Sequence, residues 1–284
     1  MLLIKKASVL NNYLEQEVKK GKTTGFVPTM GALHEGHLAL ISTCKSENDI
    51  CICSIFVNPT QFNDPTDFKK YPVTIEQDIK MLEEAGCDIL FLPQVSEIYP
   101  EGTDPRRHYE LGYLETILEG KYRPGHFQGV CMVVHRLLDI VAPQQLYLGQ
   151  KDYQQCMVIE KLITLIHKSE KIKINICPTL REPDGLAMSS RNRRLNEAQR
   201  KKAPAIFQAL LQVKNKVGSN PPEVLKAEAV AELHHKGFRV DYIEIADAST
   251  LSPVSKWQTN QQLVLLAAAF LDDVRLIDNI TTLS

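Results

Sequence analysis

The chain has 284 residues, of which 44% are hydrophobic and 24% charged, and its formal net charge is −1. A chain of this length can bury a substantial core and form two domains, and its composition is ordinary for a globular protein. The charge gives no sign of bulk nucleic-acid binding. The sequence has neither an apolar run of about 18 residues nor the apolar region of a signal peptide. We therefore expect a cytoplasmic protein that binds neither nucleic acid nor membranes.

Strand patterns alternate with helix patterns over the first part of the chain. Apolar, β-branched runs indicate strands, and the longest of them suits a strand buried on both faces of a parallel sheet. The expected strands cover residues 25–27, 50–57, 88–92, 145–148 and 172–177, the last with the alternation of an edge strand. Helical spacing of apolar residues predicts helices after residue 8 and after residue 37, and then at residues 75–86, 129–141 and 153–168.

Two of these helices begin with capping patterns. Ser8 can cap the first helix, which Gly21 would close, and Thr74 with Gln77 forms a capping-box pattern before the third. Residues 94–128 show no regular period, because proline, glycine and charged residues interrupt it. A long irregular segment in a compact domain is often a lid or a binding loop.

This alternation favours a Rossmann-like, mostly parallel α/β sheet with helices on both faces, which we place at residues 1–177. Ligands of such sheets bind beyond the carboxyl ends of the strands. Residues 30–37, 58–61 and 149–152 each follow an expected strand and carry polar or glycine-rich sequence. We expect these three segments to lie at one edge of the sheet.

The pattern changes after residue 177. A polar stretch leads to helices that begin near Asn196 and Pro222, and then to strand-like runs at residues 238–245 and 263–270. Helices followed by antiparallel-looking strands indicate a smaller α+β domain, which we place at residues 178–284.

The seven cysteines give no sign of disulfides or of a metal site. Their number is odd, several lie in apolar periodic segments, and the spacing of Cys51 and Cys53 is not that of a zinc site. We expect all seven to be reduced and structural.

The most informative stretch is FVPTMGALHEGH at residues 26–37. A strand enters a turn of small residues and a helix follows, so the turn can present backbone amides and the helix N-terminus to an anion, most plausibly a phosphate. His34 and His37 are three residues apart and would project to one side of the first helical turn, where each can donate to phosphate oxygens. Alternatively, the two histidines are zinc ligands, although no third ligand stands at a familiar spacing, or they are ordinary surface or core residues.

Two further turns carry cationic groups. Lys151, in the turn GQKD, is a mobile positive charge able to reach a phosphate, and its alternative interpretation is a solvated surface lysine. Met188, Ser189, Ser190 and Arg191 offer two hydroxyl groups and a guanidinium group, which can bind phosphate through two hydrogen bonds. The alternative for this segment is an ordinary polar linker.

Two glutamines follow different strands. Gln61 and Gln155 are neutral donors and acceptors that can orient a hydroxyl group or carboxylate of a small polar substrate. A glutamine is more often a surface residue, so this interpretation depends on the neighbouring motifs.

An HxGH turn after the first strand and a Ser-rich basic loop after the last resemble the nucleotidyl-transferase superfamily that includes class I aminoacyl-tRNA synthetases. The longer strings VPTMGALHEGH, SIFVNPTQF, RPGHFQGV, LGQKDYQQ and DGLAMSSRN, in this order and spacing, resemble the pantothenate synthetase (pantoate–β-alanine ligase) family over both domains. The departures are small. Gln150 stands where glutamate is usual in that family, and Thr60 stands where leucine is common.

The resemblance implies an AMP-forming ligase. Pantoate would attack the α-phosphate of ATP to give pantoyl adenylate and pyrophosphate, and β-alanine would then displace AMP. The implied partners are small molecules only (pantoate, β-alanine and ATP with Mg²⁺), and the protein ligands of the metal are unknown. The family resemblance also implies a homodimer and a C-terminal lid that closes through a hinge at residues 178–194, which would keep water away from the adenylate.

The same resemblance assigns the site residues. His37, His34, Lys151 and Arg191 would be catalytic, with His37 as the proton donor. The ATP site would be lined by Met30, Gly31, Ala32, Leu33, His34, Glu35, Gly36, His37, Gly149, Gln150, Lys151, Asp152, Leu180, Met188, Ser189, Ser190 and Arg191. The substrate would be bound by Gln61, Gln155, Asn58 and Arg123.

Two other functions fit parts of the pattern. A nucleotidyltransferase that acts on a phosphorylated acceptor would share the HxGH turn and the Ser/Arg loop, but it would need additional cationic contacts. A nucleotide sensor without catalytic activity would keep the glycine turn but would need neither Lys151 nor both histidines. The neutral pair of glutamines favours an uncharged, polyol-like substrate.

Overall fold

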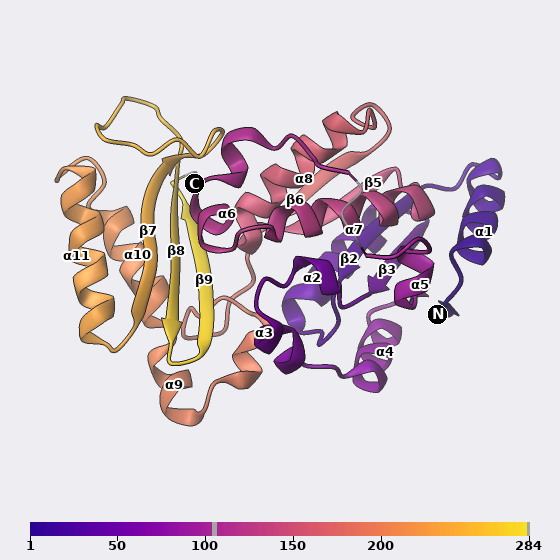
Figure 1. Ribbon diagram of the computed structural model, residues 1–284, viewed down its shortest axis with the longest axis horizontal. Coiled ribbons are helices and arrows are strands. Elements are labelled where there is room, and N and C mark those ends of the chain that lie inside the picture. The colour runs from indigo at the N-terminus through magenta and orange to yellow at the C-terminus, as the bar shows by residue number, and fades with distance from the viewer. Residues whose placement is uncertain (104–106, 283–284) are drawn as a thin grey trace. The chain divides into compact units, whose positions relative to one another are not determined.

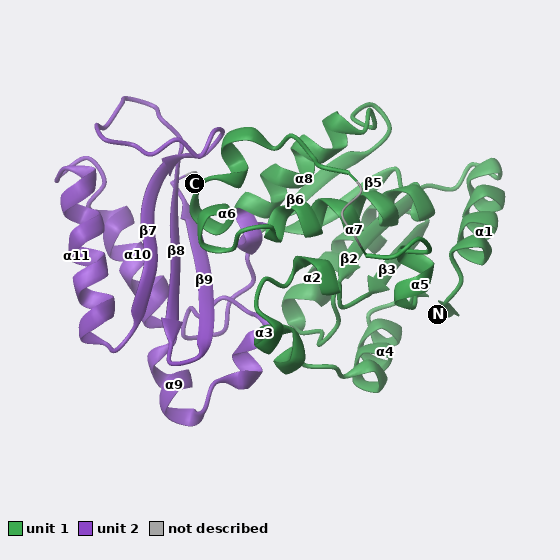
Figure 2. Ribbon diagram, viewed as in Figure 1, with its two compact units in different colours: residues 1–149, 154–178 green, residues 150–153, 179–284 purple. Residues whose placement is uncertain are grey.

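The computed structural model describes residues 1–103 and 107–282, in which the chain forms two compact units (Figure 2). Unit 1 consists of Met1–Gly149 and Gln154–Pro178, and unit 2 of Gln150–Tyr153 and Thr179–Ser284. The short segment Gln150–Tyr153 therefore groups with unit 2, although its neighbours on both sides in sequence belong to unit 1.

Unit 1 is built on a six-stranded sheet in which all strand pairs are parallel. The strands are β1 (Leu2–Ile4), β2 (Thr24–Thr29), β3 (Ile50–Ile55), β4 (Ile89–Phe91), β5 (Gln145–Gly149) and β6 (Lys173–Cys177), and their order is β1-β4-β3-β2-β5-β6. The parallel α/β sheet and the edge position of β6 are confirmed. The edge strand β1 was not expected, because it has only three residues and two of them are exposed.

The strand order reverses direction at β2. From β2 the chain continues to β3 on one side, and β5 later pairs with β2 on the other side. In open parallel sheets a ligand crevice lies at such a reversal, beyond the carboxyl ends of the two strands. Thr29 and Gly149 end β2 and β5, so the segments that follow them leave the sheet at this point.

Helices cover both faces of the sheet in unit 1, as expected (Figure 1). Phe26 and Ile52 point to a core shared with α1 (Ala7–Lys19), α7 (His126–Val141) and α8 (Tyr153–Leu165), whereas Val27 and Cys53 point to a second core with α2 (Glu35–Glu47) and α4 (Ile75–Glu84). This division follows from the two-residue period of a strand. Among the described residues of unit 1, the other α-helices are α3 (Pro65–Lys70), α5 (Val95–Ile98) and α6 (Leu118–Tyr122), with 3₁₀ turns at Pro59–Gln61 and Gly112–Glu115.

Neither of the two expected N-terminal helix caps in this unit forms. Helix α1 begins at Ala7 after Lys6, so Ser8 lies inside the helix and is not its cap. Thr74 precedes α4 but makes no capping hydrogen bond, because its hydroxyl group instead donates to Asp78 at 3.0 Å.

The described residues of unit 2 form three α-helices and a three-stranded antiparallel sheet. The helices are α9 (Glu197–Lys202), α10 (Ala205–Asn215) and α11 (Pro222–His235), and the strands β7 (Arg239–Asp247), β8 (Leu263–Leu271) and β9 (Val274–Thr281) pair in that order. Asn196 and Gln199 form a capping box at the start of α9. The unit has its own apolar core. Strand β9 was not expected, because Asp278 and Asn279 interrupt its apolar pattern.

The cysteines have the reduced, structural character that their positions in the sequence predict. All seven cysteines are buried and free of disulfides. Burial raises the pKa of the Cys131 thiol to about 12, and that of Cys53 well above its usual value, so these thiols stay protonated. In the part of the chain that the structure describes, no helix has the length and apolar character needed to cross a membrane.

Candidate active site

The turn between β2 and α2 has a conformation that depends on its small residues. Gly31 has φ of +81° and Ala32 has φ of +50°, both in the left-handed region. A Cβ atom on Gly31 would lie 2.9 Å from the Ile55 side chain and 3.1 Å from the Asp78 carboxylate. Glycine is therefore required at this position, both for the backbone angle and for the space.

A buried carboxylate from α4 holds this turn. Asp78 is fully buried, and its two oxygens accept the backbone amides of Ala32 and Leu33 at 2.9 Å each. These two amides of the turn are therefore engaged by Asp78. Asp78 was not among the expected site residues, although its position in the sequence contained a signal. Asp78 stands three residues after Ile75 and four before Leu82, on the apolar face of its helix.

The two histidines stand side by side at the start of α2. His34 is the N-cap residue, and its Nδ1 accepts the backbone amide of Gly36 at 3.1 Å. This bond places the proton of the neutral ring on Nε2, where it can be donated to an anion. The rings of His34 and His37 have centroids 4.0 Å apart and are tilted by 38°. The adjacent Glu35 and Gly36 form the first turn of α2.

The zinc alternative finds no support. Among residues 1–103 and 107–282, no group of three or more His, Cys, Asp and Glu side chains is placed to hold a metal ion.

Asn58 and Gln61 follow β3 and lie close to the histidine turn. Gln61 is 9% exposed, its Nε2 donates to the Met30 sulfur at 3.1 Å, and its Oε1 accepts from Asn58 at 3.1 Å. Asn58 is 1% exposed and also donates to the Gly129 carbonyl at 3.1 Å. The Tyr99 hydroxyl donates to Asn58 at 2.8 Å, and burial raises the pKa of Tyr99 to about 12, which keeps this donor protonated. Asn58 thus orients Gln61.

Thr60 adds to the same network. Its hydroxyl group donates to Asn58 Oδ1 at 3.0 Å, a bond that an apolar side chain at this position could not make. Thr60 therefore adds to the support of Asn58.

The motif RPGHFQGV is also organised around Gln61. The His126 Nδ1 contacts the Gln61 carbonyl oxygen at 2.8 Å, and its Nε2 lies 3.0 Å from the Arg123 guanidinium group. Because the guanidinium group can only donate, the ring accepts at Nε2 and donates from Nδ1. Arg123 also lies 3.5 Å from the Glu119 carboxylate. These contacts hold the main chain of Gln61 against His126, the first residue of α7.

The two glutamines at the start of α8 have different environments. Gln154 is buried, and its side chain donates to the carbonyls of Leu114 and Ile117 at 2.8 and 3.0 Å and accepts the Glu119 amide at 2.9 Å. Gln155 is half-buried. The structural role of Gln154 leaves Gln155 as the glutamine suited to contact a substrate.

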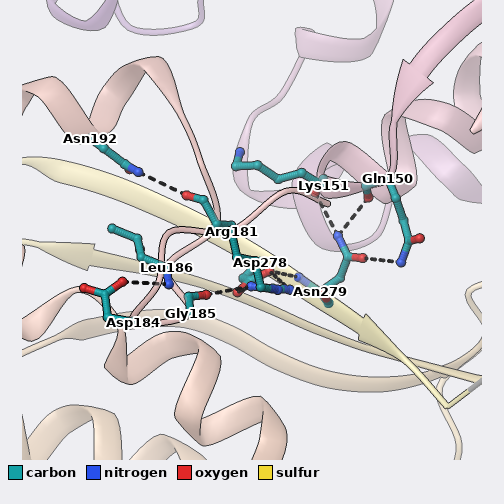
Figure 3. A network of polar contacts seen from close by, with 10 residues as sticks. Gln150, Lys151, Arg181, Asp184, Gly185, Leu186, Asn192, Asp278 and Asn279 are labelled. Atoms are coloured by element: carbon teal, nitrogen blue, oxygen red, sulfur yellow. Dashed lines mark hydrogen bonds and ion pairs between the residues drawn. The ribbon is translucent and has the colours of Figure 1, made fainter. Parts of the chain in front are cut away.

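The remaining predicted residues lie in unit 2, except Gly149. Gly149 ends β5 in unit 1, and Gln150, Lys151 and Asp152 form the 3₁₀ turn that follows. The carbonyls of Gln150 and Lys151 accept from the Asn279 side chain on β9, and the Lys151 side chain leads away from this contact (Figure 3).

The loop that contains the Ser/Arg motif is a short hairpin. Arg181 bridges to Ala187, and the Met188 amide donates to the Leu180 carbonyl at 3.1 Å. Ser189 caps the 3₁₀ turn Ser190–Arg194 by accepting the Arg191 amide at 3.3 Å. The Leu180 side chain is 41% exposed, and Ser190 is buried. The predicted residues therefore form two groups, the first in unit 1 around His34, His37 and Gln61, the second in unit 2 around Lys151 and Met188.

Comparisons with known proteins show the family of the chain. The model of the pantoate-β-alanine ligase family matches residues 2–281. The chain is 44% identical over 283 residues to the pantothenate synthetase of Cytophaga hutchinsonii, with 99% of each chain covered, and 42% identical over 281 residues to that of Thermosipho africanus, with 98% and 99% covered.

Solved structures give the same result. The pantothenate synthetase of Thermus thermophilus has a TM-score of 0.89 and 40% identity, with 99% of each chain covered. The pantoate-β-alanine ligase of Francisella tularensis, complexed with β-γ ATP and β-alanine, has a TM-score of 0.80 and 38% identity, with 100% of this chain and 98% of that chain covered. The chain belongs to the pantoate-β-alanine ligase family.

Proposed function

We propose that this chain condenses (R)-pantoate with β-alanine in an ATP-dependent reaction that yields pantothenate, AMP and pyrophosphate. The observation that carries the proposal is the family match over residues 2–281, together with the HxGH turn at the point where the strand order of the sheet reverses. The Francisella relative, which is complexed with β-γ ATP and β-alanine, supports the choice of substrates.

The reaction has two steps. A carboxylate oxygen of pantoate attacks the α-phosphorus of ATP, the bond to the bridging oxygen breaks, and pyrophosphate leaves with the electron pair. The amine of β-alanine then attacks the acyl carbon of pantoyl adenylate, loses a proton and displaces AMP. The first step spreads negative charge over phosphate oxygens, so the protein must supply positioned donors and positive charge.

The catalytic groups would be His34, His37, Lys151 and Arg191. The Nε2 proton of His34 and the neighbouring His37 ring form a pair of donors at the N-terminus of α2, where the helix dipole also favours an anion. We propose His37 as the proton donor to the leaving group. Lys151 and Arg191 would add positive charge from unit 2. Around them, the ATP site would consist of residues 30–37, Gly149, Gln150, Asp152, Leu180 and residues 188–190.

Pantoate would be held by the two glutamines. Gln61 has a carboxamide oriented by Asn58, and Gln155 lies half-buried at the start of α8. Both can bind hydroxyl and carboxylate groups without adding a charge to the site. Asn58 and Arg123 act on the substrate chiefly through Gln61, because their contacts orient its side chain and its main chain.

Mg²⁺ would enter bound to the nucleotide. No carboxylate cluster among the described residues is suited to hold an ion, and Mg²⁺ commonly keeps several waters and binds through substrate phosphates. The ion would neutralise phosphate charge. We also propose that the enzyme is a cytoplasmic homodimer, and that residues 178–284 act as a lid over the nucleotide-binding domain of residues 1–177.

Omitting one substrate at a time tests the proposed function. With ATP and Mg²⁺, pyrophosphate release should require pantoate, and AMP release should require β-alanine as well. Pyrophosphate release that is driven by a phosphorylated acceptor, with pantoate inert, would instead identify a nucleotidyltransferase. ATP binding without turnover of any acceptor would identify a nucleotide sensor.

A further inference from the structure

Strand β9 carries two adjacent polar residues in a buried position. Asp278 and Asn279 are each 2% exposed, although the sheet that contains them contributes many residues to an apolar core. Burial of a polar side chain is costly unless hydrogen bonds replace the lost water. The partners of these two side chains therefore indicate why polar residues stand at these positions.

Asn279 is fully engaged with the turn that carries Lys151. Its Nδ2 donates to the carbonyls of Gln150 at 3.0 Å and of Lys151 at 2.8 Å, and its Oδ1 accepts from Gln150 Nε2 at 3.3 Å (Figure 3). Two carbonyls on the Nδ2 side fix the orientation of the carboxamide, because only its nitrogen can donate. A single side chain thus holds two consecutive residues of the turn.

The third of these bonds requires a donor at position 150. With its nitrogen directed to two carbonyls, Asn279 presents its oxygen to residue 150, and the Gln150 amide nitrogen meets it. A glutamate at this position would bring two acceptors together. The amide of Gln150 is therefore matched to Asn279.

Asp278 holds the other nucleotide-binding segment of unit 2. It forms a bidentate pair with Arg181 at 2.7 and 2.9 Å, and Arg181 also donates to the carbonyls of Gly185 at 3.0 Å and of Asn279 at 3.1 Å. The Arg181 guanidinium group lies 3.9 Å from the centre of the Phe207 ring. Burial raises the pKa of Asp278, and Arg181 opposes this rise. The hairpin that carries Leu180 and Met188 is thereby fixed to β9.

We propose that Asn279 is a positioning residue for catalysis, which holds Lys151 on β9 next to the hairpin that Asp278 anchors. The inference rests on the role of Lys151 under the proposed function. It implies that Lys151 moves with the C-terminal unit and not with the sheet strand that precedes it in sequence, in agreement with the grouping of Gln150–Tyr153 in unit 2.

The first test compares Asn279→Ala with Ile280→Val, a conservative change at the next position of the strand. Both variants are assayed by ATP–pyrophosphate exchange with pantoate, and rates are normalised to the fraction of protein that binds ATP in calorimetry. Misplacement of a catalytic group by about 1 Å can lower a rate about 10²-fold. We expect Asn279→Ala to lower kcat by about 10- to 100-fold, with KM for ATP changed by less than about 3-fold, and Ile280→Val to resemble the wild type.

The second test asks whether the effect passes through Lys151. If Asn279 acts by holding Lys151, adding Asn279→Ala to Lys151→Ala should cause no further loss, because contributions that act through the same group are not additive. A purely structural role would lower the rate by the same factor in both backgrounds, and that result would overturn the inference. Wild-type kcat in folded Asn279→Ala would overturn it as well.

The tests also give an answer if Asn279→Ala fails to fold or if Lys151→Ala keeps its activity. If Asn279→Ala does not fold, the same cycle is run with Asn279→Ser, which retains one donor, and the same outcomes apply. If Lys151→Ala turns over at the wild-type rate, the inference fails together with the role of Lys151. Failure of the proposed function itself is distinguishable, because it would appear as pantoate-independent pyrophosphate release by the wild type.

Discussion

The position of the two histidines depends on a single residue of another helix. Asp78 accepts the amides of Ala32 and Leu33, and these bonds hold the left-handed backbone of Ala32, two residues before His34. The hydroxyl group of Thr74 supplies a third donor to the same carboxylate. A buried amide that loses its acceptor costs about 1–3 kcal/mol. The turn is therefore stable only while both carboxylate oxygens remain acceptors.

Asp78→Asn tests this dependence. The amide nitrogen of asparagine cannot accept, so one of the two backbone amides loses its partner while the shape of the side chain is kept. We expect the free energy of unfolding to fall by about 1–3 kcal/mol in urea titrations. Pyrophosphate exchange should fall by at least about 10-fold, because the histidine turn shifts. Glu76→Gln, which removes an exposed carboxylate from the same helix, is the control and should change neither quantity much. Wild-type stability and exchange in Asp78→Asn would contradict the proposed support.

At the scale of elements, the approach of α7 to the turn Pro59–Gln61 places Gln61. A Cβ atom on Gly129 would collide with the Thr60 carbonyl group, so only glycine allows this approach. The Gly129 carbonyl in turn accepts from Asn58, which orients the Gln61 side chain. The close contact between two elements distant in sequence thus determines where a substrate-binding carboxamide stands.

Gly129→Ala should therefore behave unlike an ordinary substitution within a helix. Replacing glycine by alanine inside a helix usually stabilises it by about 0.5–1 kcal/mol. Here overpacking should dominate, and we expect a loss of about 1–3 kcal/mol in denaturant unfolding together with a higher KM for pantoate. Gly149→Ala is the matched control for stability, because a Cβ atom there meets no heavy atom within 4 Å. Equal stability of the two variants would argue against the contact.

At the scale of the whole molecule, the sequence predicted what depends on local periodicity. The buried run that became β3 and the helix expected to begin near Asn196 are examples, because each reports on a few neighbouring residues. The sequence missed β9, since its buried Asp278 and Asn279 are satisfied by partners distant along the chain. It also missed Asp78, whose role depends on the turn at Ala32 and Leu33. Polar residues buried by long-range contacts break the patterns on which sequence analysis depends.

The two units have separate apolar cores, and a single tryptophan reports on one of them. The core of unit 2 includes residues of α10, α11, β7, β8 and β9, whereas the two cores around the parallel sheet draw on unit 1. Trp257, the chain's one tryptophan, packs against the core of unit 2, and its indole N–H donates to the Asn220 carbonyl at 2.8 Å. Its fluorescence therefore follows the unfolding of unit 2, while far-ultraviolet circular dichroism follows the whole chain.

We expect these two signals to give different transition midpoints in urea without ligand, because units with separate cores can unfold separately. The substitutions Trp257→Phe and Phe62→Trp move the fluorescent reporter to unit 1, where the ring centroids of Phe62 and Phe68 lie 5.2 Å apart. The fluorescence of this variant should then follow the unfolding of unit 1. If the proposed site draws on both units, ATP with pantoate should raise both midpoints, because at 100 times the dissociation constant a ligand adds about 2.7 kcal/mol to the free energy of unfolding. Superimposable curves without ligand would show that the units unfold as one. A ligand shift confined to the Phe62→Trp reporter would show that unit 2, and Lys151 with it, does not contribute to binding.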